Sequence, residues 1–206
     1  MRSEEFVNLM HSRSMSVFSS ADAERALGKG TKYTSLFLRR LAHAGRISAI
    51  ERGKYYVAGT DSYAVASNIV YPSYVSLFSA FRYHGITTQN VIGIDIVSPK
   101  PHAEIKCGDD TIRFATLPGS RIFGFYRDKE TGAFVATIEK AVVDSLYLRN
   151  PPIGYVVDAL EAAAENSKLY TDRLHVFAHR MGSRVLLQRL EGACKEAGVD
   201  VIIRGI

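Results

Sequence analysis

Residues 17–57 read VFSSADAERALGKGTKYTSLFLRRLAHAGRISAIERGKYYV, and this stretch decides the fold of the first part of the chain. Ser19 and Ser20 are helix-start signals, because a serine oxygen accepts a hydrogen bond from an unpaired amide of the first turn. A short helix over residues 21–27 is expected to follow them and to break at Gly28-Lys29-Gly30. The pattern therefore predicts a helix that leads into a tight turn.

A second helix and a hairpin follow that turn. Thr31 is expected to cap a helix over residues 31–44, which Gly45 closes. Residues 46–50 and 54–57 are β-type runs joined by a turn that contains glycine. A helix, a turn, a second helix and a basic hairpin together predict a winged helix-turn-helix, whose second helix enters the major groove of DNA.

The distribution of charge favours the same interpretation. Residues 1–58 hold 10 Lys and Arg against 5 Asp and Glu, whereas residues 59–206 hold 16 of each sign, so the formal excess of +5 lies in the first segment. Such a basic segment attracts DNA phosphates, although a small helical domain with an ordinary solvated face is the alternative. The residues predicted to contact DNA are Lys29, Lys32, Tyr33, Thr34, Ser35, Arg39, Arg40, Arg46, Arg52 and Lys54.

Each of these side chains has an expected role. Bases are expected to be read from the second helix by Lys32, Thr34, Ser35 and Arg39. Phosphates are expected to be held by Arg40, Arg46, Arg52 and Lys54. The buried stripe of this helix is predicted to consist of Tyr33, Leu36, Phe37 and Leu41, with Thr34 facing outward. Tyr33 has two interpretations, as a core residue or as a phosphate contact through its hydroxyl.

Composition limits the class of protein. The chain has 206 residues with 47% hydrophobic content, and its mean hydropathy is near zero, as in globular proteins. It contains no apolar run of about 18 residues, and its first residues lack the apolar core of a signal peptide. Cys107 and Cys194 are far apart, so neither a disulfide framework nor a zinc ribbon is indicated. We therefore expect a cytoplasmic protein without a membrane segment and without a cofactor.

The remainder of the chain is predicted to form a second domain. The boundary is placed at Gly59, giving a winged domain over residues 1–58 and an α+β domain over residues 59–206. Helices are expected over residues 61–71, 73–84, 138–149, 153–167, 172–181 and 184–197. Short strands are expected between residues 91 and 137, and a further one over residues 199–203. The fold class is thus α+β, with a mostly antiparallel sheet followed by C-terminal helices.

Two patterns for phosphate or metal binding are set aside. The glycines at Gly28 and Gly30 are too close together for a phosphate loop and lie between two helices. His175 and His179 are four residues apart on a predicted helix, as in zinc-binding pairs. Neither the glutamate of a metalloprotease nor a third ligand accompanies them, so a half-buried or partner-facing pair is the preferred interpretation.

A nuclease pattern is weighed more closely. Asp95 lies in one predicted strand and Glu104 and Lys106 in the next, across a short turn. This layout is similar to that of restriction-type nucleases, in which two carboxylates hold Mg²⁺ and a lysine assists the attacking water. Alternation of Glu and Lys is equally typical of a half-exposed antiparallel strand, and Ile94 stands where that family commonly has proline. We predict that the three residues lie on the surface and have no catalytic role.

Four passages resemble the AbiEi-type antitoxins, which are transcriptional regulators of viral defence. They are FSSADAERALG, LRRLAHAGRISAIERGKYYV, YPSYVSLFSAFRYHGITTQ and VATIEKAVVDSLYL, and they fall within the first 150 residues. The resemblance implies a winged DNA-binding domain and a second domain that counters a partner toxin. That toxin is expected to be a nucleotidyltransferase encoded next door and countered without a stable complex. The resemblance also implies repression of the protein's own promoter, and we expect inverted repeats in that duplex.

Our prediction from the sequence is a non-enzymatic regulator that acts as the antitoxin of an abortive-infection-type pair. Its acting surface is predicted at four basic residues of the last two helices, Arg173, Arg180, Arg184 and Arg189. Two alternatives stay open: a winged-helix repressor whose second domain senses a ligand or forms a dimer, and a metal-dependent nuclease. The operator and the oligomeric state stay open as well.

Overall fold

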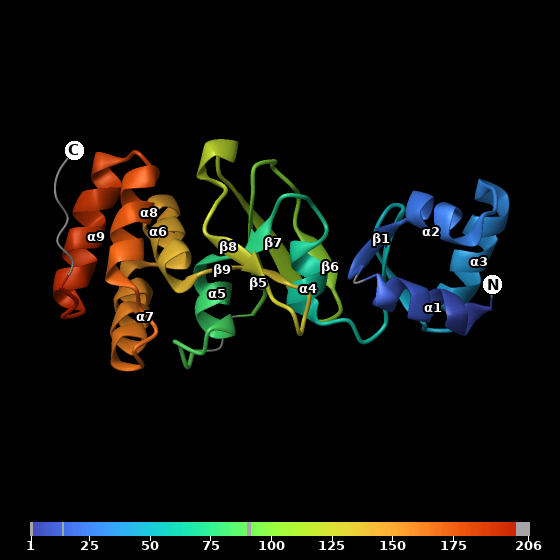
Figure 1. Cartoon of the computed structure of the whole chain (residues 1–206), viewed down its shortest axis with the longest axis horizontal. Coiled ribbons are helices and arrows are strands. Elements are labelled where there is room, and N and C mark those ends of the chain that lie inside the picture. The colour runs from blue at the N-terminus through green and yellow to red at the C-terminus, as the bar shows by residue number, and fades with distance from the viewer. Residues whose placement is uncertain (1, 14, 90–91, 201–206) are drawn as a thin grey trace.

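A computed structural model describes residues 2–13, 15–89 and 92–200, and it confirms the α+β class (Figure 1). The winged segment contains helices α1 (Ser3–Ser12), α2 (Ser20–Leu27) and α3 (Thr31–His43) and strands β1 (Val17–Ser19), β2 (Ile47–Glu51) and β3 (Lys54–Val57). The strands form an antiparallel sheet in the order β1-β3-β2. The third strand, β1, had not been predicted, because it is only three residues long.

Local chemistry explains the start of α2. Ser19 is the N-cap, and its hydroxyl accepts from the Asp22 amide at 3.1 Å while the Asp22 carboxylate accepts from the Ser19 amide at 2.8 Å. Burial alone would raise the pKa of Asp22, but the hydrogen bonds from Ser19 and the charge of Arg25 outweigh it and lower that pKa. At the start of α3 the prediction was wrong, since Gly30 is the N-cap and Thr31 is the first helical residue.

The second part of the chain is built around a mixed sheet. Its strands are β4 (Tyr74–Val75), β5 (Ile94–Ser98), β6 (Ile105–Cys107), β7 (Asp110–Thr116), β8 (Phe125–Arg127) and β9 (Phe134–Ala136). Their order is β6-β7-β5-β4-β9-β8, with β7-β5 and β4-β9 parallel and the other three pairs antiparallel. The helices are α4 (Ser62–Ser67), α5 (Leu77–Tyr83), α6 (Ile138–Leu148), α7 (Ile153–Glu165), α8 (Thr171–Arg180) and α9 (Arg184–Glu196), and a 3₁₀ turn covers Gly119–Arg121.

Two predictions in this part were wrong. Tyr74 was expected in a helix but lies in β4 opposite Val97, where its buried ring stacks on Phe125 at 4.6 Å. The helix expected over residues 61–71 ends at Ser67, whose hydroxyl accepts a hydrogen bond from the Phe134 amide of β9 at 3.0 Å. In both places contacts to the sheet outweigh the helical spacing of the apolar residues. The last predicted strand, over residues 199–203, falls largely on Val201–Ile203, outside the described residues.

Three buried clusters hold the molecule together. One lies inside the winged segment, around Phe6, Phe18 and Leu38. A second joins α5 to α9 on one side of the large sheet. The third lies around α4 and also contains Ile50 of β2, so the wing packs against the sheet. The division at Gly59 remains a prediction, because Ile50 belongs to this shared cluster.

Figure 1 shows how the elements are arranged. The winged segment lies at one end of the molecule, the large sheet in the middle and helices α7 to α9 at the other end. Helix α3 lies on the outer side of the winged segment, away from the sheet. Within the described residues, none of the helices has both the length and the apolar character that crossing a membrane requires. The arrangement leaves α3 open to a large partner.

Candidate nucleic-acid interface

Helix α3 has one buried and one exposed face. The buried face consists of Thr34, Leu38 and Leu41. The opposite face carries exposed side chains at helical spacing: Lys32, Leu36, Arg39 and His43. The helix contains no acidic residue, and its 13 residues span about 20 Å. A basic exposed helix of this length matches the dimensions of the DNA major groove.

The predicted buried stripe of α3 was half right: Leu41 is buried and Phe37 packs against the same cluster, but Tyr33 and Leu36 are exposed. Thr34 was expected to face outward but is 1% exposed, and its hydroxyl donates to the Lys29 carbonyl at 3.4 Å. Tyr33 is 50% exposed and Leu36 49% exposed, so neither is a core residue. Thr34 therefore supports the turn and cannot read bases, whereas Tyr33 remains available to DNA. Leu36 was not predicted as a DNA contact. Because Leu38 is buried, the helical period places Leu36, two residues earlier, on the opposite and exposed face.

The wing contributes fewer free basic side chains to the predicted DNA interface than the sequence suggested. Arg52 is exposed at the hairpin turn, as expected. Lys54, however, donates to the Ile69 carbonyl at 2.6 Å and pairs with Glu51 at 2.6 Å. His102 approaches the same Glu51 carboxylate at 3.2 Å. Lys54 thus ties the wing to the second part of the chain, and we remove it from the predicted phosphate contacts.

The remaining predicted contacts are all exposed. They are distributed over the turn, the helix and the start of the hairpin: Lys29, Ser35, Arg40 and Arg46. Together with Lys32 and Arg39 they place basic side chains from the turn before α3 to the residue just before β2. A spread of this kind lets one helix hold phosphates on both sides of a groove.

The comparison with family models agrees with this geometry. Residues 5–58 match the family described as "Transcriptional regulator, AbiEi antitoxin". This match confirms the resemblance that the sequence suggested. It covers the winged segment, so the AbiEi match bears on α3 and the wing and leaves residues 59–206 outside it. None of the curated proteins compared with the chain matches it.

A solved structure extends the likeness in fold beyond the AbiEi match. The crystal structure of the RV2827C protein from Mycobacterium tuberculosis aligns with a TM-score of 0.61 at 14% sequence identity. The alignment covers 94% of this chain and 76% of that chain. At this identity the likeness shows the fold alone.

The four arginines predicted as an antitoxin surface do not form one array. Arg173 lies 3.5 Å from the buried Glu139 carboxylate, and Arg189 donates to the Leu146 carbonyl at 2.9 Å. The Arg180 guanidinium lies 4.0 Å from the centre of the Phe123 ring. Arg184 is exposed at the start of α9. Three of the four therefore have partners within the protein, and the AbiEi match does not reach any of them.

The nuclease pattern is not assembled. Strand β7 lies between β5 and β6, so Asp95 is separated from Glu104 and Lys106 by a strand, a gap of about 9–10 Å between the outer strands. Asp95 is buried, contrary to our expectation of a surface residue, and accepts from Arg113 at 3.0 Å. Lys106 donates to the Thr111 hydroxyl at 2.8 Å. The expectation that the strands of Asp95 and Lys106 are joined by a short turn was wrong, because β6 forms its hairpin with β7 rather than with β5.

The histidine pair lies on α8 as predicted. The rings of His175 and His179 are 4.3 Å apart, and their Nε2 atoms are buried without a hydrogen-bond partner. Across residues 2–13, 15–89 and 92–200, no three His, Cys, Asp or Glu side chains come together as metal ligands would.

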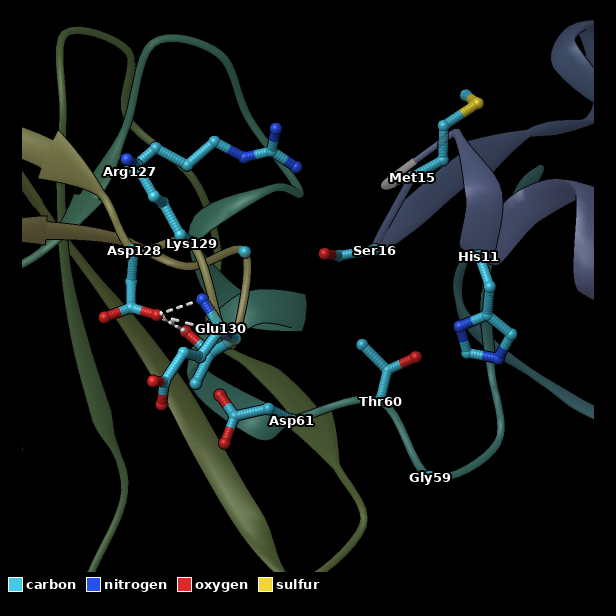
Figure 2. A pocket seen from close by; sticks show the side chains of 12 residues that line it. His11, Met15, Ser16, Gly59, Thr60, Asp61, Arg127, Asp128, Lys129 and Glu130 are labelled. Carbon is cyan, nitrogen blue, oxygen red and sulfur yellow. Dashed lines mark hydrogen bonds between the residues drawn. The ribbon is translucent and has the colours of Figure 1, made fainter.

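A cleft of about 740 Å³ lies where the winged segment meets the second part of the chain (Figure 2). It is lined on one side by His11, Met15 and Ser16 and on the other by the loop of residues 127–132. The Asp128 carboxylate accepts from the amides of Glu130 and Thr131 at 2.8 and 2.9 Å, which holds that loop in a tight turn. Acidic and basic side chains alternate around the cleft, so it does not extend the basic surface of α3.

Proposed function

We propose that this chain is a DNA-binding transcriptional regulator and the antitoxin of an abortive-infection-type pair. It represses its own promoter, which contains inverted repeats, and counters a nucleotidyltransferase toxin encoded beside it. The AbiEi match over residues 5–58 supports a DNA-binding antitoxin regulator. The observation that carries the DNA-binding part is the basic, exposed face of α3 at the outer side of the winged segment.

In this proposal α3 lies in the major groove. Lys32, Ser35 and Arg39 contact base edges, since an arginine can hold a guanine through two hydrogen bonds. Leu36 is an apolar partner for a thymine methyl group. The phosphates are held by Lys29, Arg40, Arg46 and Arg52, with Tyr33 at the edge of the helix.

The reading and holding roles predict different mutant behaviour. Arg39→Ala is expected to lose about 1–3 kcal/mol of discrimination between operator and random duplex, because a bidentate base contact disappears. Arg52→Ala is expected to weaken both duplexes alike and to reduce the slope of log affinity against log salt by about one. Both quantities come from fluorescence anisotropy titrations at several salt concentrations.

The control for this pair is Lys100→Ala, which removes an exposed charge from the second part of the chain. Its affinity and salt slope are expected to equal those of the unchanged protein. If Arg52→Ala alone abolished the sequence preference, the wing would be the reading element and the proposed docking of α3 would be wrong.

A separate prediction concerns the nuclease alternative. Supercoiled plasmid incubated with the protein and Mg²⁺ or Mn²⁺ is expected to remain uncut, because β7 keeps Asp95 apart from Glu104. The measurement is the conversion of supercoiled to nicked DNA on a gel. Nicking that disappeared in Glu104→Ala would establish an enzyme and contradict the proposal.

A further inference from the structure

A second, smaller pocket lies among the C-terminal helices, far from α3. Its volume is about 380 Å³, within the range that holds small organic ligands. It is formed where α6 ends, where α7 begins and where α9 passes, and its lining residues are Ser145, Leu146, Arg149, Pro151, Pro152, Ile153 and Arg189. These include two arginines and no acidic residue, in contrast to the mixed charges of the larger cleft.

One residue of this pocket's lining, Ser145, carries a buried hydroxyl without a partner in the described part of the chain. Ser145 is 0% exposed, and its Oγ has no hydrogen-bond partner among the described residues. A buried polar group left unpaired destabilises the protein unless something else bonds to it. A bound molecule that accepts a hydrogen bond would satisfy Ser145.

Arg149 gives the pocket a charge that the fold itself does not use. Its side chain makes no ion pair or hydrogen bond with any residue that the structure describes, and it is exposed. Its backbone is left-handed, with φ of +57°, at a helix end where glycine is usual. An arginine in a left-handed backbone position beside a cavity, with no partner among the described residues, points to a role for its side chain.

The other basic group is held in place. Arg189 donates through Nη1 to the Leu146 carbonyl at 2.9 Å, which fixes its guanidinium against the end of α6. Its other N–H groups can still donate to a bound molecule. The first turn of α7, with Ile153 in the lining, adds the positive end of a 13-residue helix, while Arg189 bonds to a carbonyl at the negative end of α6 in the same pocket. The rest of the lining is apolar, from Leu146 to the two prolines.

We propose that this pocket binds a small organic anion: one carboxylate or phosphate group attached to an apolar body. The anionic group lies between Arg149, Arg189 and the Ser145 hydroxyl, and the apolar body packs on Leu146, Pro152 and Ile153. This site goes beyond the proposed DNA binding and antitoxin action, and it gives the second part of the chain a ligand of defined chemistry.

The test uses the full chain and four probes: phenyl phosphate, benzoate, inorganic phosphate and benzyl alcohol. Phenyl phosphate or benzoate at tenfold excess over its Kd is expected to raise the thermal midpoint of unfolding by about 3–5 °C. Whichever raises it at the lower concentration identifies the anionic group. Inorganic phosphate, which lacks an apolar body, and benzyl alcohol, which lacks a charge, are expected to bind at least tenfold more weakly.

Three variants locate the site. Arg149→Gly removes the guanidinium and relieves the left-handed backbone, so it is expected to fold at least as well and to bind about tenfold or more weakly. Ser145→Ala removes an unpaired hydroxyl, so its stability without ligand is expected to be unchanged or higher, with binding roughly 3- to 10-fold weaker. Arg184→Ala, on α9 outside the lining, is the matched control and is expected to bind normally.

Three outcomes would overturn the proposal. The first is that neither phenyl phosphate nor benzoate shifts the thermal midpoint. The second is a shift that persists in Arg149→Gly, which would place the ligand elsewhere. The third is equal binding of inorganic phosphate and phenyl phosphate, which would show that the apolar lining has no part in recognition. None of these results depends on DNA binding, so they leave the proposed function untouched.

Discussion

Asp144→Ala is expected to lower the free energy of unfolding by about 3–5 kcal/mol, because it leaves a buried ammonium without its counter-charge. Asp144 and Lys140 form an ion pair within α6, and both side chains are 0% exposed. The carboxylate also accepts from the Tyr74 and Ser76 hydroxyls, each at 2.9 Å. Burial raises the pKa of Asp144 and lowers the pKa of Lys140, so each group depends on the other to stay charged.

Among the described residues, the surroundings of Lys140 offer its ammonium no other counter-charge once the Asp144 carboxylate is removed. Its ammonium lies 4.4 Å from the centre of the Phe123 ring and 3.7 Å from the Met181 sulfur, and the side chain is fully buried. These contacts join α6 to the sheet through Tyr74 and to the end of α8 through Met181. Loss of the carboxylate therefore weakens the whole layer of C-terminal helices.

Chemical denaturation of the full chain measures the effect. The matched control is Lys106→Met, an exposed lysine on β6 whose loss is expected to change stability by less than about 1 kcal/mol. The double variant Lys140→Met with Asp144→Leu removes both charges and is expected to be more stable than Asp144→Ala alone. A change below about 1 kcal/mol in Asp144→Ala would show that the pair does not support the fold.

The sequence predicted the winged segment well because its signals are local. The serine at Ser19 caps α2, the glycines at Gly28 and Gly45 end helices in the left-handed conformation, and the hairpin turn contains Gly53. Each signal acts within a few residues, so a single sequence is enough to recognise it. Tyr33, Thr34 and Leu36 of α3 were misplaced because Thr34 is polar yet buried, where it bonds to the preceding turn.

The second part was harder to predict because its determinants are far apart in the chain. The charged side chains of Glu139 and Lys140 on α6 are both buried, and no local pattern in the sequence indicates this. The hydroxyl partners of the Lys140–Asp144 pair lie about 70 residues earlier, in and beside β4. The strand order is equally non-local, since β7 pairs between β5 and β6. The pocket at Ser145 was not predicted, because no pattern in the sequence brings α9 to the end of α6.

A full-length variant that cannot bind DNA is expected to separate the two activities of the proposed antitoxin. Lys32→Ala, Arg39→Ala and Arg40→Ala together remove three exposed charges from α3. Operator affinity is expected to fall by about 100- to 1000-fold and the salt slope by about 0.9, because Arg40 is the one of the three that is assigned to a phosphate. The fold is expected to survive, since none of these side chains is buried. A full-length chain is needed because Ile50 and Lys54 join the wing to the second part.

Growth of cells that express the neighbouring toxin provides the second measurement. If toxin is countered by the second part of the chain, the triple variant expressed from a constitutive promoter rescues growth as well as the unchanged protein. The reciprocal variant, Arg184→Glu, is expected to keep operator affinity and to lose rescue, because Arg184 is exposed while Arg173, Arg180 and Arg189 contact other residues of the chain. A control with Lys100, Lys129 and Lys195 changed to Ala removes the same charge elsewhere and is expected to retain both activities. Loss of rescue in the triple α3 variant alone would mean that protection depends on DNA binding, and the chain would then act as a repressor only.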